Sequence, residues 1–573
     1  MMGRTARTAE LDTVALAPPM RDGTKGRIAL IFAACAMLYV AIGVRLVTLG
    51  MADPVAAGGF LVSPQDEVQA ARPDIVDRRG EVLATDLATA SLYAEPRNII
   101  DVDEAVTLLT GVLPDLDEEE LRADLSTDRG FVWLKREIPA RTREAVHDLG
   151  IPGIGFLTET RRFYPGGRTV GHVVGHVNID NEGIAGLEKA IDGGGLSALQ
   201  AVGLARKGRS IAPVRLSLDL RVQHAVRDEL TRAMERYKAM ASVGVVLDAK
   251  TLEVVAMSSL PDYDPNNPAE ALDPVRMNRA MTGVFELGSV FKTFTIAAAL
   301  DAGVVNMSST VDARYPLQIG KYSIKDFHAK SRVLTVPEVF KYSSNIGTAK
   351  VALAMGAERQ KAYLRALGMF DAVSSELPET ARPLVPPSWP KVTAATVSFG
   401  HGLAVTPMHA AAAAAAVLNG GIYASPTFYP RSEAEMMAVG RRVISQRASL
   451  SMRELFALNA AEGSGRRARV PGYNVGGKTG TAEKASKGGY ARDKRLNSFL
   501  AAFPIDDPKY VVLVVIDEPK PEEGERYATA GMNAAPTVAN IISRIGPMLD
   551  VAPRFENDDV VERAITVAYQ DSE

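Results

Sequence analysis

Ser289-Val290-Phe291-Lys292 is the first of three short motifs that together indicate the fold of this 573-residue chain. Ser343-Ser344-Asn345 and Lys478-Thr479-Gly480 follow it at long range. A Ser-x-x-Lys match alone carries little information, since both residues are common in proteins. The three motifs in this order, with glycines around the last, are far more specific. Together they predict a serine nucleophile with lysine partners.

The first motif places a base beside a nucleophile. A serine hydroxyl reacts poorly at neutral pH unless a base lies within hydrogen-bond reach. Residues i and i+3 share one helix face, so we expect Lys292 beside the Ser289 hydroxyl, at the positive end of the helix dipole. Lysine acts as a base only when neutral, a form favoured by burial and by a nearby positive charge such as Lys478. The backbone N–H groups of Ser289 and Thr481 are the candidates for an oxyanion hole.

The second motif is expected to contribute to proton transfer and to substrate positioning. Ser343 is expected to pass a proton toward the leaving amine. Asn345 is expected to hold Lys292 and a substrate amide, because a side-chain amide both donates and accepts hydrogen bonds. Each residue also has a purely structural interpretation: Ser289 as a helix N-cap, and the triplet as the cap of a helix over 346–354. The joint occurrence of the motifs favours catalysis.

The third motif lies in a glycine-rich stretch, 474–482, that predicts a strand with little side-chain bulk. Glycine in a strand often marks close approach by a ligand, so we expect a peptide to add along the strand edge. Lys478 is a candidate ligand for a substrate carboxylate, although an ordinary exposed lysine is the alternative. The predicted substrate-binding residues are Thr479, Gly480 and Thr481.

In these three motifs the chain resembles the class B penicillin-binding proteins, which are peptidoglycan D,D-transpeptidases. The resemblance covers residues 27–545. It includes Arg276-Met277-Asn278-Arg279-Ala280, the segment 396–407 with its Gly-His-Gly, and the opening of a pedestal domain at 72–84. Two departures, Leu287 and His401, are expected to affect only the shape of the cleft. A third departure is Arg79 in place of a common asparagine.

The resemblance implies an α+β protein. It would have an N-terminal transmembrane helix, an elongated pedestal domain, and a transpeptidase domain with a five-stranded antiparallel sheet flanked by helices. The implied catalytic residues are Ser289, Lys292, Ser343, Asn345 and Lys478. The predicted boundaries are a cytoplasmic tail at 1–26, a transmembrane helix at 27–49, a pedestal at 55–214, a transpeptidase domain at 215–549 and a C-terminal tail at 550–573.

The activity that the resemblance implies is acyl transfer. Ser289 would attack the penultimate D-alanine carbonyl of a stem peptide and release the terminal D-alanine. An amine of a neighbouring stem would then take the acyl group. β-Lactams are expected to acylate the same serine, and neither a metal nor an organic cofactor is expected. The implied partners are an FtsW-type glycan polymerase and other division proteins.

The division-specific FtsI type is favoured by the chain length, by the run at 171–176 and by Ala534-Ala535-Pro536. An elongation-type enzyme of the same class is a close alternative. A serine β-lactamase or β-lactam sensor is less favoured, because it does not need a long pedestal. A division scaffold with a vestigial site is the alternative without catalysis.

An apolar run at 28–44, with Arg45 after it, is about long enough to cross a bilayer. Basic residues precede it, so the positive-inside rule places the N-terminus in the cytoplasm and the rest of the chain in the periplasm. A cleaved signal peptide is the alternative. The 65 basic and 68 acidic residues nearly cancel, which argues against a nucleic-acid surface. The single cysteine, Cys35, excludes an intrachain disulfide.

Local patterns predict further elements. A helix is expected at 118–125 behind an acidic cluster, and a tightly packed one at 410–416. Strands are expected at 91–94, 242–247, 253–257, 499–503 and 510–516. His172 and His176 have the spacing of metal ligands. However, no glutamate follows His172, and the β-branched residues around 169–174 favour a strand, so we expect no metal site.

Overall fold

The computed structural model describes residues 32–33, 36–40, 42, 72–193, 212–486 and 489–555. The chain divides into two compact units, Met1–Glu67 and Val68–Glu573. The transmembrane helix predicted at 27–49 lies largely outside the described residues. Among the residues that are described, none of the helices has the length and apolar character needed to cross a bilayer.

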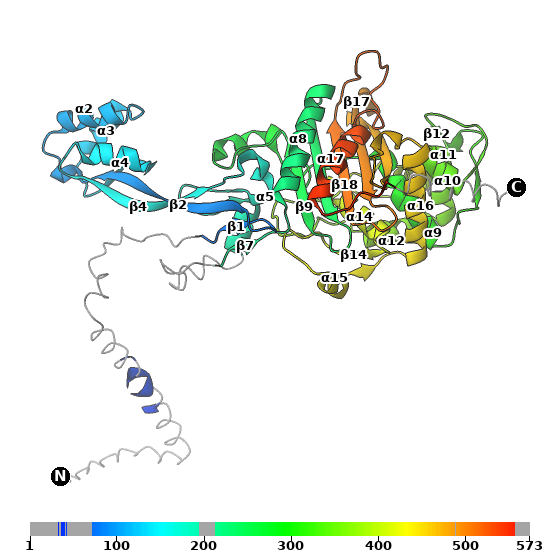
Figure 1. The fold of residues 1–573 in the computed structure, drawn as a ribbon, viewed down its shortest axis with the longest axis horizontal. Coiled ribbons are helices and arrows are strands. Elements are labelled where there is room, and N and C mark those ends of the chain that lie inside the picture. The colour runs from blue at the N-terminus through cyan, green and yellow to red at the C-terminus, as the bar shows by residue number, and fades with distance from the viewer. Residues whose placement is uncertain are drawn as a thin grey trace, which may run out of the picture. The chain divides into compact units, whose positions relative to one another are not determined.

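The second unit opens with a sheet built around one long strand (Figure 1). β2 (Val82–Ala94) pairs with β4 (Ile154–Phe163) and, near its end, with β3 (Val132–Ile138). β1 (Ile75–Val76) pairs with both β2 and β7 (Val214–Arg215). The strand predicted at 91–94 was too short. It is the buried end of β2, whose middle residues are partly exposed and lack an apolar pattern.

Three helices pack on the far end of this sheet, in one core with the last residues of β2. They are α2 (Val102–Val112), α3 (Glu118–Leu125) and α4 (Ala140–His147). The α3 prediction is confirmed, with Asp117 as N-cap.

The strand predicted over 169–174 is wrong, because α5 (Gly171–Val174) is a short helix. His172 bonds to the carbonyl of Arg276 and His176 lies against Tyr263. The remaining elements here are β5 (His176–Val177), β6 (Gly183–Ala185) and α6 (Gly186–Ile191).

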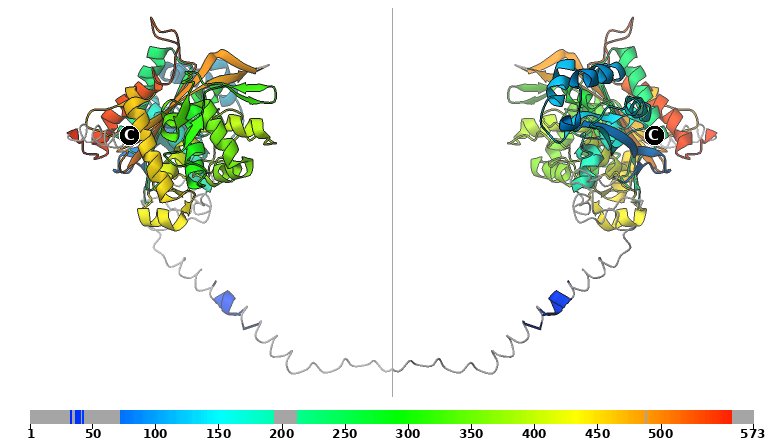
Figure 2. Two further views of the ribbon diagram at one scale, coloured as in Figure 1. Left: turned by 90° about the vertical axis from the view of Figure 1, so that its right-hand side faces the viewer. Right: turned by 90° about the vertical axis from the view of Figure 1, so that its left-hand side faces the viewer.

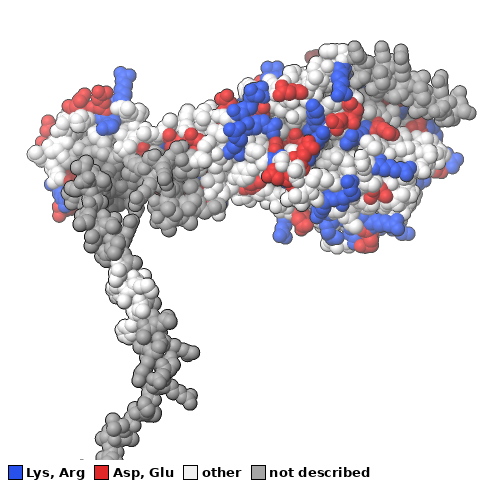
Figure 3. Space-filling model, turned by 60° about the horizontal axis from the view of Figure 1, so that its bottom comes forward, with Lys and Arg blue, Asp and Glu red and all other residues white. Residues whose placement is uncertain are grey.

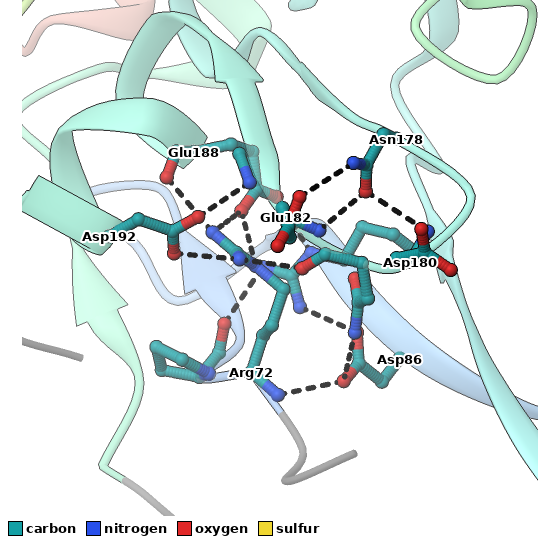
Figure 4. Close-up of polar contacts among 11 residues, drawn as sticks. Arg72, Asp86, Asn178, Asp180, Glu182, Glu188 and Asp192 are labelled. Atoms are coloured by element: carbon teal, nitrogen blue, oxygen red, sulfur yellow. Dashed lines mark hydrogen bonds and ion pairs between the residues drawn. The ribbon is translucent and has the colours of Figure 1, made fainter. Parts of the chain in front are cut away.

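A buried ion cluster joins the start of this domain to β2, β4 and α6 (Figure 4). Arg162 contacts Glu188 at 2.7 Å and Asp86 at 3.0 Å. Arg72 contacts the other Glu188 oxygen at 2.8 Å and also reaches Asp192 at 2.7 Å. The side chains of both arginines and of Glu188 are at most 3% exposed. Each buried cation therefore has a carboxylate partner, which a buried charge requires.

The next domain is centred on a five-stranded antiparallel sheet, as predicted. Its order is β16-β17-β18-β8-β9, so β16 is an edge strand. The strands are β16 (Gly476–Ser486), β17 (Gly489–Phe503), β18 (Tyr510–Asp517), β8 (Ala241–Asp248) and β9 (Val254–Leu260). The predicted strands at 242–247, 499–503 and 510–516 fall within them, and the strand predicted at 253–257 begins one residue before β9.

Both faces of the sheet are covered by helices. In β18, Val511 and Leu513 join the core that contains α14 (Pro407–Leu418), whereas Val512 and Val514 join the core with the opposite helices. This alternation follows from the period of two in a strand. Those opposite helices are α8 (Leu220–Tyr237) and α17 (Ala534–Met548). α14 contains the helix predicted at 410–416.

The rest of the domain is mostly helical and lies between β9 and β16 in sequence. In Figure 2 the red α17 and the yellow-green helices of residues 345–397 occupy opposite sides of the domain. The helices are α9 (Lys292–Asp301), α10 (Val336–Lys341), α11 (Asn345–Met355), α12 (Ala357–Ala366), α13 (Lys391–Val397), α15 (Glu433–Val439) and α16 (Gln446–Glu462).

Short hairpins and bridges complete the domain. They are β10 (Thr310–Asp312), β11 (Leu317–Ile319), β12 (Tyr322–Ile324), β13 (Val333–Thr335), β14 (Ile422–Tyr423) and β15 (Arg441–Arg442). On the face drawn in Figure 3, basic and acidic side chains are interspersed, in keeping with a net charge of −3.

Candidate active site

Ser289 lies in a tight turn and not in the body of a helix. Gly288–Phe291 form a 3₁₀ helix, and α9 begins at Lys292. The expected single helix is therefore wrong in its first turn. The predicted juxtaposition still holds, because the Lys292 Nζ lies 3.0 Å from the Ser289 Oγ. Residues i and i+3 nearly eclipse in a 3₁₀ turn, so this geometry also brings the two side chains together.

Glycines allow three backbone segments to converge behind Ser289. Gly288 has a φ of +56°, and a Cβ there would lie 2.9 Å from the carbonyl oxygen of Thr481. A Cβ on Gly480 would lie 2.3 Å from the Leu287 carbonyl, and one on Gly400 would lie 2.1 Å from that of Gly288. No side chain fits at these contacts, so the glycines of the third motif and of Gly-His-Gly set the position of the serine turn.

Lys292 is fully buried and is surrounded by the second motif. Its Nζ donates to Asn345 Oδ1 at 2.7 Å, lies 3.0 Å from Ser343 Oγ and contacts the Ser343 carbonyl. Burial lowers the pKa of Lys292 well below its ordinary value, and the charge of Lys478 lowers it further. Both effects favour the neutral amine, which is the form that a base requires.

Lys478 reaches the same hydroxyl from β16. Its Nζ lies 3.0 Å from Ser343 Oγ and donates to the carbonyl of Thr479 at 3.1 Å. The side chain is fully buried, and burial lowers the pKa of Lys478 to about 7. The interpretation as an exposed lysine is therefore wrong. Ser343 Oγ bridges two lysine amines that have no carboxylate within ion-pair distance among the described residues.

Of the second motif, only Ser344 acts as a helix cap, whereas Ser343 and Asn345 contact Lys292. Ser344 Oγ accepts a hydrogen bond from the N–H of Gly347 and caps α11. Asn345, the first residue of α11, turns Oδ1 to Lys292 while its Nδ2 donates to the carbonyl of Lys325 at 3.1 Å. The helix predicted at 346–354 and the catalytic geometry therefore coexist.

The threonines of the third motif lie along the edge strand. Thr479 is buried, with its hydroxyl 2.5 Å from that of Ser464, and Thr481 Oγ1 accepts from the N–H of Ala530 at 3.1 Å. Gly480 packs beneath the serine turn. Among the strands that the structure describes, β16 pairs with β17 alone, so its other edge can accept an extended peptide. The candidate residues of all three motifs are thus gathered at one place.

Sequence reasoning missed the residues that support this arrangement. Asp326 accepts from Ser344 Oγ at 2.7 Å, and Ser464 contacts Thr479. Neither residue lies within a motif, so only the fold could reveal them. Of the departures, Leu287 is buried behind the serine turn, and His401 packs between Phe399 and Tyr490. Burial lowers the pKa of His401.

No cluster suited to a metal ion occurs in the part of the chain that the structure describes.

Comparison with known families agrees with this geometry. Residues 242–543 match the penicillin-binding protein transpeptidase domain, and residues 67–205 match the penicillin-binding protein dimerisation domain. The first match contains all three motifs. It also contains both outer strands of the five-stranded sheet, β9 and β16.

Individual relatives extend over most of the chain. The chain is 38% identical to the probable peptidoglycan D,D-transpeptidase FtsI of Caulobacter vibrioides, over 93% of this chain and 90% of that protein. It is 30% identical to the peptidoglycan D,D-transpeptidase FtsI of Escherichia coli K12, covering 85% of each. A solved structure, the apo transpeptidase domain of Burkholderia pseudomallei penicillin-binding protein 3, aligns with a TM-score of 0.53 and 30% identity. It covers 59% of this chain and 97% of that one.

The chain therefore belongs to the penicillin-binding protein transpeptidase family. The dimerisation domain and the FtsI relatives identify it more closely as a class B peptidoglycan D,D-transpeptidase of the FtsI type.

Proposed function

We propose that Ser289 is the acylated nucleophile of this transpeptidase and that Lys292 is its base. The contact that carries this proposal is the 3.0 Å separation of Ser289 Oγ from a buried lysine amine whose pKa is lowered. Lys292 takes the hydroxyl proton as the oxygen attacks the penultimate D-alanine carbonyl of a stem peptide. Burial of the amine favours its neutral form before the attack.

Ser343 then passes a proton toward the leaving D-alanine amine. Its Oγ lies 3.0 Å from both Lys292 and Lys478, so a proton taken from Ser289 can move through the hydroxyl without large motion. Asn345 orients Lys292 through its Oδ1. In the second half of the reaction, an amine of a neighbouring stem attacks the ester, and the same groups return the proton.

The donor peptide adds to the free edge of β16. Lys478 and the hydroxyls of Thr479 and Thr481 bind its terminal carboxylate, and Gly480 keeps the strand free of side-chain bulk. The N–H groups of Ser289 and Thr481 stabilise the oxyanion. The close packing of Gly288 against Thr481 supports this assignment, because it holds the two backbones together.

In the cell, we infer that the chain cross-links peptidoglycan at the septum of a bacterial inner membrane. The FtsI relatives support a division role. The apolar run at 28–44 supports a single N-terminal anchor with the catalytic domain in the periplasm. An FtsW-type glycan polymerase is the expected membrane partner. A fluorescent fusion that marks the side wall and not the septum would favour the elongation-type alternative.

The nucleophile is tested by labelling membranes with a fluorescent penicillin. Wild-type protein should give a stable covalent band, and Ser289→Ala should give none. Ser543→Ala, an exposed serine on α17, is the matched control and should label like wild type. A band that persists in Ser289→Ala would overturn the assignment. Rapid loss of the wild-type band would instead indicate a β-lactamase.

A further inference from the structure

A segment beside the active site carries lysines that have no counter-charge. Residues 321–330, termed here the basic arm, contain Lys321, Lys325 and Lys330, and all three are exposed. No carboxylate lies within ion-pair distance of them among the described residues. The arginines that flank the arm differ, because each has an acidic partner: Arg314 pairs with Asp312 at 2.9 Å and Arg332 pairs with Glu338 at 2.5 Å.

The arm is attached directly to the catalytic triplet. The carbonyl of Lys325 accepts from Asn345 Nδ2 at 3.1 Å, and Asp326 accepts from Ser344 Oγ at 2.7 Å. Asn345 in turn contacts Lys292 at 2.7 Å. The only carboxylate of the arm thus faces inward and holds the arm on α11. The lysine side chains are exposed, and the backbone of Lys325 borders the triplet.

The arm also meets the β16 side of the site. The exposed ring of Phe327 lies 6.3 Å from that of Tyr527, and the segment after Tyr527 reaches β16 where Ala530 donates to Thr481 Oγ1. A chain bound between the triplet and β16 is therefore bounded by the arm. The parts of a substrate beyond its reacting end would therefore extend toward the arm.

We propose that the basic arm binds carboxylates of the peptidoglycan strand whose stem peptide reacts at Ser289. This inference rests on the proposed function and deepens it. A glycan strand with many uncross-linked stems is a polyanion, because each stem carries free carboxylates. Exposed ammonium groups attract such a chain over several ångströms, and added salt screens that attraction. The alternative is that the three lysines are ordinary solvated surface residues. In that case, replacing them would leave the affinity for the peptidoglycan strand unchanged.

The test measures binding of uncross-linked peptidoglycan strands to the full chain carrying Ser289→Ala, at low and at physiological salt. Lys321→Glu, Lys325→Glu and Lys330→Glu together should weaken binding about tenfold at low salt, as expected for several exposed ion pairs. The salt dependence of the Kd should also decrease. The matched control changes three exposed lysines elsewhere that likewise lack a carboxylate partner, Lys238, Lys391 and Lys509, to Glu.

An unchanged Kd, or equal weakening in the control, would overturn the proposal. Penicillin labelling, with Ser289 restored, keeps this result separate from the proposed function, because a small β-lactam does not extend over the arm. Labelling should match wild type in the arm variant. Loss of labelling there, repeated with the milder Lys→Gln changes, would show that the arm acts on the triplet and not on the strand. Failure of wild type to label would count against the nucleophile.

Discussion

The buried arginines of the pedestal and the buried lysines of the active site face the same physical problem and resolve it in opposite ways. Burial alone would lower the pKa of Arg162, but the charges of Glu188 and Asp86 outweigh it and the pKa is raised. Burial lowers the pKa of Lys292, and the charge of Lys478 lowers it further, while its close partners are an amide, a hydroxyl and a carbonyl. The presence or absence of a carboxylate decides whether a buried cation is structural or reactive.

The largest effect on acylation is expected when the cation at position 292 cannot lose its proton. Lys292→Arg places a guanidinium, which does not lose its proton, beside Ser289. Penicillin acylation should slow by about 10²–10⁴-fold, the usual contribution of a general base. Stopped-flow acylation measures the rate, and thermal unfolding checks the fold. Acylation within a few-fold of wild type would mean that Lys292 is not the base.

The pedestal should respond in stability and not in chemistry. Glu188→Gln leaves Arg72 and Arg162 buried with one fewer counter-charge. Loss of one partner of a buried pair typically costs about 3–5 kcal/mol. Urea unfolding should show this decrease, while the acylation rate per folded molecule stays as in wild type. A change of less than about 1 kcal/mol would show that the cluster tolerates an uncompensated charge, contrary to the usual cost.

A single change can make the active site resemble the pedestal. Asn345→Asp puts a carboxylate 2.7 Å from the Lys292 amine, in place of the amide oxygen. An opposite charge so close raises a lysine pKa by about 1–3 units. Acylation at neutral pH should fall roughly 10- to 1000-fold and recover as the pH rises, since each unit costs tenfold. A loss that is the same at every pH would indicate misplaced geometry.

The smallest effect is the pH dependence that Lys478 gives to stability. Its pKa is about 7 in the folded chain, against about 10.4 when unfolded. Between these values the unfolded chain binds the extra proton, so this contribution to stability grows as the pH rises from 7 and is lost as the pH falls toward 7. Relative to Lys478→Met, the free energy of unfolding of the wild type should increase by up to about 1.4 kcal/mol per pH unit between pH 7 and 9. Denaturation at pH 7, 8 and 9 measures it, and parallel curves would contradict the low pKa.

The sequence motifs predicted the site better than they predicted its supports. Ser289, Ser343 and Lys478 lie in short patterns whose chemistry fixes their neighbours, so their convergence was predictable. The 3₁₀ turn at Gly288 depends on contacts with Gly400 and Thr481, which are distant in sequence. Asp326 binds the second motif from outside any pattern. These features need the fold, because no local rule links the residues concerned.

The same contrast holds for the fold. Strands β8 and β18 are buried apolar runs and were found. β2 was found only at its end, because its middle is held by pairing with β4 and not by burial of an alternating face. α5 was predicted as a strand from its valines. The prediction failed because tertiary packing overrode their β preference. The predicted anchor at 27–49 stays a prediction.

The free edge of β16 has a consequence for how this enzyme chooses a bond. A peptide added to a sheet edge is held through its main chain, and a slip of one residue would turn every side chain to the opposite face. If a terminal carboxylate is fixed at one end of the strand, as proposed, Ser289 would meet a carbonyl at a set number of bonds from that end. The edge would therefore select the bond to be cleaved by its distance from the C-terminus of the bound peptide. Peptides that end one residue earlier or later would present the wrong carbonyl.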